Sequence, residues 1–123
     1  MTDGEMFFKK MELSDLQCNP FDMIGKSWYL LTSGTPEDYN TMTASWGAMG
    51  EIWGAPSFHC VVRTNRYTAF AQARRVLICR KRYTAMMQPE GFIEPETYER
   101  WYGTDPMHRE FVGEVLAYYE KLH

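Results

Sequence analysis

The sequence predicts a mainly β protein, built as an antiparallel barrel or sandwich with little helix. Two observations predict this class: short aromatic and apolar runs alternate with turns rich in Gly and Pro, and no βαβ rhythm or internal repeat is present. At 123 residues, 45% of them hydrophobic and 24% charged, the chain has enough material for one core. We therefore expect one domain over residues 1–123, with residues 1–18 as a poorly ordered N-terminal extension.

The first half of the chain predicts three strands. Residues 1–26 read as irregular, with a turn at residues 19–21. A strand over 27–32 is followed by a loop over 33–38. A second extended segment over 40–53 contains too much Gly and Thr for a helix of that length. After a turn at 54–56, residues 57–63 form the third strand.

The second half predicts two more strands and a short helix. Residues 69–73 could hold one helical turn, and residues 75–83 place an apolar centre inside a cationic frame, which suits a strand. Residues 95–102 form a short helix, because Pro95 suits a first helical position and Gly103 follows the last one. Residues 110–121 match both helical and strand periodicity, and Gly113 tilts the prediction toward a strand.

Composition excludes several classes of protein. The net charge of −3 creates no overall field that would recruit nucleic acid or an anionic membrane. The N-terminus carries acidic residues and no long apolar run, so we expect no signal peptide and no membrane span. Three cysteines without CxxC spacing favour free thiols in a reducing compartment, and we expect a cytoplasmic protein.

The remaining titratable residues give weak signals. His59 and Cys60 are neighbours on a predicted strand and point to opposite faces, so they make a poor ligand pair, and no structural metal is expected. Cys60 and Cys79 are interpreted as buried small hydrophobes, and His108 as a polar loop residue. A solvated helix face is expected at Glu94, Glu96, Glu99, Arg100 and Asp105.

The stretch NTMTASW at residues 40–46 is the first candidate binding segment. On a strand its three hydroxyl residues share one face, and they alternate with Met42, Ala44 and Trp46. Such a row can hydrogen-bond the polar edge of a ligand, while a small alanine lets a planar ring approach the backbone. A solvent-exposed hydroxyl face with Trp46 in the core explains the same pattern. The hydroxyl residues are Thr41, Thr43 and Ser45.

The stretch RTNRYT at residues 63–68 is the second candidate segment. Arg63, Arg66 and Thr68 could clamp a phosphate, because guanidinium groups offer paired donors and a hydroxyl adds a neutral one. A polar turn with exposed cations is the alternative. Seven of the thirteen cationic residues lie between residues 63 and 82, which suits an anion site or a solvated strand face. Together the two segments describe a site for an aromatic ring that carries a phosphate.

Five blocks of the sequence resemble, in order, the flavin reductase-like family with the FMN-binding split-barrel fold. The blocks are NPFDMIGKSWYLLTSG, NTMTASWGAMGEIWGAP, VVRTNRYT, ARRVLICRKRY and WY…HREFVGEV, and they cover most of residues 19–120. The family includes flavoredoxins and NAD(P)H-dependent flavin or ferric reductases. The resemblance implies an antiparallel, Greek-key type split barrel with short helices. It also implies electron transfer on a bound flavin, so no side chain need act as acid, base or nucleophile.

The resemblance also implies the site residues and partners. The segment over residues 40–46 lies along the flavin, and the turn over residues 63–68 receives its phosphate. Family members are typically homodimers that take NAD(P)H as electron donor. The chain departs from the family between Thr68 and Arg74, where about one strand and one helix are missing. The implied FMN contacts are Asn40, Thr41, Met42, Thr43, Ala44, Ser45, Trp46, Arg63, Asn65, Arg66, Tyr67 and Thr68.

Two other functions compete with an FMN-dependent oxidoreductase. A shortened split-barrel homologue without flavin would act as a dimeric structural or interaction module. Binding of single-stranded nucleic acid on an aromatic and basic sheet face is suggested by Trp46, Tyr67 and the arginine cluster. The acidic net charge argues against nucleic acid, and we expect no nucleic-acid partner.

Overall fold

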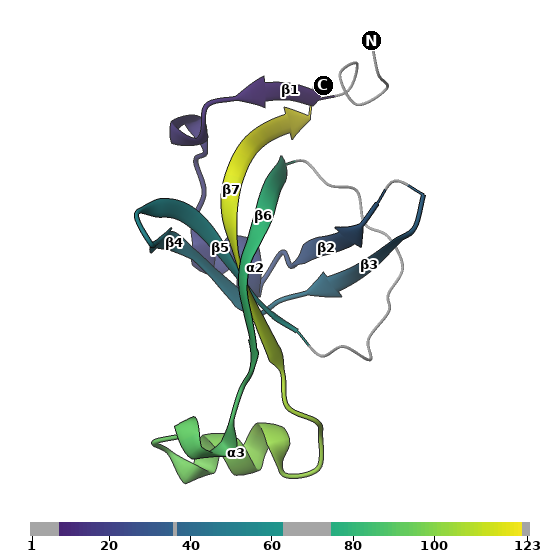
Figure 1. Cartoon of the computed structure of the whole chain (residues 1–123). Coiled ribbons are helices and arrows are strands. Elements are labelled where there is room, and N and C mark those ends of the chain that lie inside the picture. Colours follow the sequence, from purple (N-terminus) through teal and green to yellow (C-terminus); the bar gives the residue numbers. More distant parts are fainter. Residues whose placement is uncertain (1–7, 36, 63–74, 122–123) are drawn as a thin grey trace.

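The computed structural model describes residues 8–35, 37–62 and 75–121 (Figure 1). The described chain is mainly β, and every strand pair is antiparallel, as predicted. The strands form one five-stranded sheet and one separate two-stranded sheet. In chain order the elements are β1 (Phe8–Met11), η1 (Leu13–Asp15), α2 (Pro20–Gly25), β2 (Tyr29–Gly34), β3 (Tyr39–Ala44), β4 (Gly47–Ile52), β5 (Ala55–Val62), β6 (Arg75–Met86), η2 (Pro89–Gly91), α3 (Pro95–Tyr102) and β7 (Arg109–Lys121).

Strand β7 is the strand of the five-stranded sheet with which β1, β5 and β6 all pair. Its edge toward β6 is paired from Arg109 to Glu120, with two register shifts. Its other edge pairs first with β5, over residues 109–114, and then with β1, over residues 118–121. The N-terminal strand therefore lies beside the C-terminal end of the described chain, as Figure 1 shows.

The core lies between the five-stranded sheet and the elements α2 and β2. Ile24 of α2 packs with Phe58 and Cys60 of β5, and Tyr29 and Leu31 of β2 pack against this cluster. Alternate residues of β5 are buried, so one face of the sheet points into the core and the other away from it. This packing places the hairpin formed by β2 and β3 next to the sheet.

The segment before β2 is more regular than predicted. Residues 8–11 form a strand, and residues 20–25 form a helix instead of irregular chain. The side chain of Asn19 accepts a hydrogen bond from the Phe21 N–H, and Pro20 occupies a first-turn position of the helix. The residues interpreted as a turn are therefore the capped start of α2.

The other predicted elements have clear outcomes where they are described. The strands expected over residues 27–32, 75–83 and 110–121 are confirmed as β2, β6 and β7. The strand expected over 57–63 is confirmed as β5 up to Val62, and residue 63 lies outside the described residues. The extended segment over 40–53 is two strands, because Ser45 and Trp46 belong to neither ladder and separate β3 from β4. The helix over 95–102 is confirmed as α3, and its predicted solvated residues are exposed. The helical turn at 69–73 and the missing strand and helix lie outside the described residues.

Strands β4 and β5 are joined by a two-residue turn. Ile52 pairs with Ala55, and Trp53 and Gly54 between them have positive φ angles of 56° and 71°. Two-residue hairpin turns favour positive φ angles, because a turn with these angles has a twist that matches the twist of the flanking strands. Glycine adopts this conformation without strain, whereas tryptophan adopts it at a cost.

Strand β4 provides a matched pair of glycines for a stability test. A Cβ added at Gly47 would lie 2.4 Å from the carbonyl oxygen of His59, which belongs to the backbone and cannot rotate away. A Cβ added at Gly50 would meet nothing within 4 Å. We expect Gly47→Ala to lower the free energy of unfolding by about 1–3 kcal/mol, as overpacking does. Urea denaturation should show Gly50→Ala close to wild type, and equal stability of the two variants would contradict the close approach of β5 to Gly47.

Candidate functional site

The hydroxyl row predicted on residues 40–46 is present on β3. Met42 pairs with Leu31 of β2, which packs against the core, so Thr41 and Thr43 occupy the opposite face. The hydroxyl of Thr41 lies 3.1 Å from that of Thr32 on β2, within hydrogen-bond distance. Thr41 and Thr43 are half-buried. This face of the small sheet therefore offers a row of neutral donors and acceptors.

Ser45, the third hydroxyl residue, and the neighbouring Ala44 are placed differently from Thr41 and Thr43. Ser45 follows the last residue of β3, so strand alternation no longer fixes its direction. Ala44 pairs with Tyr29 of β2, and both lie on the face of the β2–β3 sheet that carries Met42. A ring resting on Ala44 would thus lie on the face opposite the threonine hydroxyls. This arrangement matches the alternation read from the sequence, in which Ala44 falls between the hydroxyl residues and points to the other face.

Trp46 joins the β3–β4 connection to the rest of the molecule. Its carbonyl oxygen accepts hydrogen bonds from the Tyr29 hydroxyl at 2.6 Å and from the Val61 N–H at 3.3 Å. Its ring packs edge-on against Trp101 of α3, with centroids 4.9 Å apart, and lies 4.6 Å from the ring of His108. The structure therefore brings Trp46 to α3, and its backbone to β5.

His108 lies in the loop before β7, as predicted, but its side chain is buried and not exposed to solvent. Its side chain is 6% exposed, and its Nδ1 lies 2.8 Å from the hydroxyl of Tyr102. The imidazole is held between this hydroxyl and the ring of Trp46. No local pattern signals this contact, because Trp46 and His108 are far apart in the chain and belong to no common periodic segment.

Burial raises the pKa values of two side chains that pack in the core, Tyr29 and Cys60. Burial, with Cys60 nearby, raises the pKa of the Tyr29 phenol far above its ordinary value. Burial likewise raises the pKa of the Cys60 thiol to about 11. Cys60 is thus a protonated core residue at neutral pH, as predicted, and not a nucleophile. Cys79 is exposed, which corrects its interpretation as a buried residue.

The remaining predicted contacts are only partly described. Asn40 pairs with Ser33 through the backbone of β3. The turn that would receive a phosphate, with Arg63, Asn65, Arg66, Tyr67 and Thr68, lies outside the described residues. The donors that the structure does place are threonine hydroxyls, which suit the carbonyl and ring-nitrogen edge of a flavin in chemical type. We therefore regard the described half of the predicted site as compatible with FMN.

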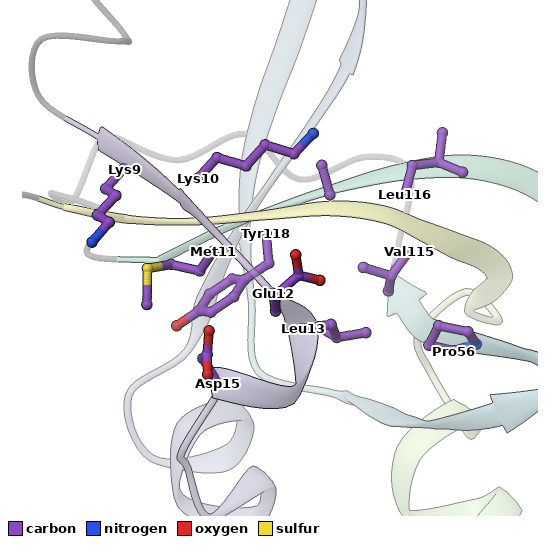
Figure 2. Close-up of a pocket in the computed structure, with 11 residues that line it drawn as sticks. Lys9, Lys10, Met11, Glu12, Leu13, Asp15, Pro56, Val115, Leu116 and Tyr118 are labelled. Carbon is purple, nitrogen blue, oxygen red and sulfur yellow. The ribbon is translucent and has the colours of Figure 1, made fainter.

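A cavity of about 690 Å³ lies away from the threonine row, between β1 and β7 (Figure 2). It opens where β7 changes partners, because Val115, Leu116 and Ala117 fall between the residues paired with β5 and those paired with β1. Lys9, Lys10, Glu12 and Asp15 also line it. Its lining mixes both signs of charge with apolar groups, so its chemistry indicates no particular ligand.

Metal-binding clusters and membrane-spanning helices are both absent from the described residues. No group of three or more His, Cys, Asp or Glu side chains is arranged to hold a metal ion in residues 8–35, 37–62 and 75–121. Among the helices of the same residues, none has the length and apolar character needed to cross a membrane.

The buried thiol of Cys60 generates a pH prediction. Because its pKa is raised from 9.0 to about 11 on folding, the native state retains its proton where the unfolded state loses it. The free energy of unfolding should therefore fall as pH rises from about 9 through 11. Chemical denaturation across this range measures the slope. Tyr29 contributes in the same direction, so Cys60→Ala should lessen the slope without abolishing it, and an unchanged slope would contradict the assignment to Cys60.

Comparison of the chain with models of known protein families, with curated proteins and with solved structures finds no match. Membership of the flavin reductase-like family thus stays a prediction that rests on the five sequence blocks.

Proposed function

We propose that the protein is an FMN-binding oxidoreductase of the flavin reductase or flavoredoxin type. It would pass electrons between NAD(P)H and a flavin, ferric or protein acceptor. The observation that carries the proposal is the half-buried threonine row on β3, with Thr41 and Thr43 on one face. The five ordered sequence blocks support it, because they relate the same segment to a flavin-binding strand.

In this proposal the protein binds and orients the cofactor. Thr41 and Thr43 would hydrogen-bond the polar edge of the flavin ring, and Arg63, Arg66 and Thr68 would hold its phosphate. Arginine suits that task, because its planar donors match a phosphate in pairs. Bound FMN would supply the hydride and electron chemistry. The described residues near the row need only fix the ring and limit its contact with water.

The anchoring of Trp46 gives the proposed site its rigidity. Its carbonyl is bonded by Tyr29 and by the Val61 N–H, and its ring is held by Trp101 and His108. The end of β3 is therefore fixed to β5 and α3 before any ligand arrives. A rigid strand end lowers the cost of ordering a site on binding.

FMN binding is the direct test of the proposal. Purified protein should be yellow, or should take up added FMN, and NAD(P)H should bleach the flavin absorbance. An absorbance spectrum before and after FMN addition, followed by anaerobic NAD(P)H titration, makes the measurement. Colourless protein that takes up no FMN would refute the proposal and would favour the flavin-free structural module.

Two variants test the predicted contacts separately. Arg66→Ala should weaken FMN binding by about 1.5–3 kcal/mol, because a charged hydrogen bond is lost, and Thr43→Val by about 0.5–1.5 kcal/mol. Fluorescence quenching of FMN measures both affinities. Lys26→Ala and Thr104→Val remove an exposed charge and an exposed hydroxyl far from these segments in the sequence, and they should bind FMN as wild type does. Equal affinity of all four variants would exclude the predicted contacts.

The split-barrel topology and a homodimer belong to the same proposal. The described strands leave β2 and β3 as a separate pair, and unpaired strand edges favour association with a second chain. Sedimentation velocity would report the oligomeric state with and without FMN. A dimer that binds no FMN would support the structural module, whereas a monomer that binds FMN would remove only the dimer from the proposal.

A further inference from the structure

The face of the five-stranded sheet that points away from the core carries a group of polar and aromatic side chains. Phe58 and Cys60 enter the core, so His59 between them points to the opposite face. The strand registers place Tyr83 of β6, Val112 of β7 and His59 in one row across the sheet. The next row contains Arg80, Glu114 and Ser57. Residues far apart in the sequence therefore share one face of the sheet. Ser57 and Val112 are buried on it, and its surface is formed by the exposed Arg80 and Tyr83.

Trp53 extends this surface from the β4–β5 turn. Its side chain is exposed, at 54%, although its backbone has the positive φ angle that tryptophan adopts at a cost. The guanidinium of Arg82 lies 5.2 Å from the centre of its ring, and the ring of Tyr83 lies 6.1 Å away at an angle of 54°. The two aromatic rings form a corner in which each remains about half exposed.

The strand irregularity next to Trp53 concentrates positive charge at this corner. A register shift between Lys81 and Tyr83 interrupts the pairing of β6 with β7 at Arg82. Bulges of this kind redirect side chains and occur often beside functional sites. Lys81 contacts the ring of Phe111 on the core-facing side, whereas Arg82 contacts Trp53. The left-handed tryptophan and the bulge are two separate departures from regular β structure, and they meet at one place.

The charges at the corner are incompletely balanced. Glu114 lies 2.7 Å from the Arg80 guanidinium and 3.9 Å from that of Arg82, so one carboxylate faces two cations. The Arg80 side chain is 64% exposed, which leaves donors directed to solvent. In the neighbouring row, the buried Nε2 of His59 has no hydrogen-bond partner among the described residues and lies 3.4 Å from Glu110. Arg80, Arg82 and Glu114 together carry one net positive charge.

We propose that the corner formed by Trp53, Arg80, Arg82 and Tyr83 binds a planar anion, meaning an aromatic ring that carries a phosphate or a carboxylate. The ring would lie against the exposed parts of Trp53 and Tyr83, since aromatic side chains stack on planar rings. The anionic group would accept hydrogen bonds from Arg80 and Arg82. This site is separate from the threonine row on β3, and it does not rest on the proposed FMN function.

Isothermal titration calorimetry on the full chain tests the proposal with four probes. Adenosine 5′-monophosphate and 4-hydroxybenzoate represent the two sources of a planar anion, adenosine lacks the charge, and inorganic phosphate lacks the ring. At least one planar anion should bind saturably, about tenfold or more tightly than either adenosine or phosphate. No saturable binding of either planar anion, or phosphate binding of equal strength, would overturn the proposal. The planar anion that binds more tightly shows whether the site prefers a phosphate or a carboxylate.

Four variants assign the binding to this corner. Trp53→Ala and Arg82→Met should each weaken binding of the preferred anion about tenfold, while circular dichroism shows that the fold is retained. Trp28→Ala is the matched control, because Trp28 is also exposed, at 56%, and also has a positive φ angle of 64°. Thr43→Val should leave this binding unchanged. If either corner variant fails to fold, the exposed Arg80→Met replaces it. Wild-type affinity in folded corner variants would overturn the proposal.

Discussion

The backbone pairing of β7 is the interaction on which the rest of the structure depends. One strand supplies partners for β6 along one edge and for β5 and β1 along the other. Its two edges therefore bring together segments from the beginning, middle and end of the described chain. Gly113 lies where β6 comes close to this strand, since a Cβ there would come within 2.9 Å of the Cys79 Cβ. The close approach of β6 to β7 requires a residue without a side chain at that point.

The second structural junction is Trp46. The Tyr29 hydroxyl and the Val61 N–H both donate hydrogen bonds to its carbonyl oxygen. The Trp101 ring of α3 packs against its indole ring. A residue expected from its sequence context to face either a ligand or the core thus connects three elements. This connection explains how a segment rich in small and polar residues can hold a defined conformation, because the anchoring comes from its neighbours rather than from its own bulk.

The two proposed binding surfaces follow from strand alternation at different places. On β3 it sends threonine hydroxyls to one face and Met42 and Ala44 to the other. On β5 it sends Phe58 and Cys60 into the core and leaves His59 outside. The surfaces also differ in charge, since the threonine row is neutral and the corner at Trp53 holds two guanidiniums against one carboxylate. Their ligands can therefore be distinguished experimentally.

The sequence by itself determined the mainly β class, the positions of β2, β5, β6 and β7, the helix over Pro95–Tyr102 and the hydroxyl periodicity of β3, because these depend on local periodicity and turn residues. It missed β1, since only four residues form that strand and their stability comes from pairing with distant β7. It placed His108 in a loop correctly but missed its burial, which depends on Tyr102 and on the distant Trp46. Only the tertiary structure decided these features, together with the meeting of Trp53, Arg82 and Tyr83, because contacts between segments far apart in the chain leave no local pattern.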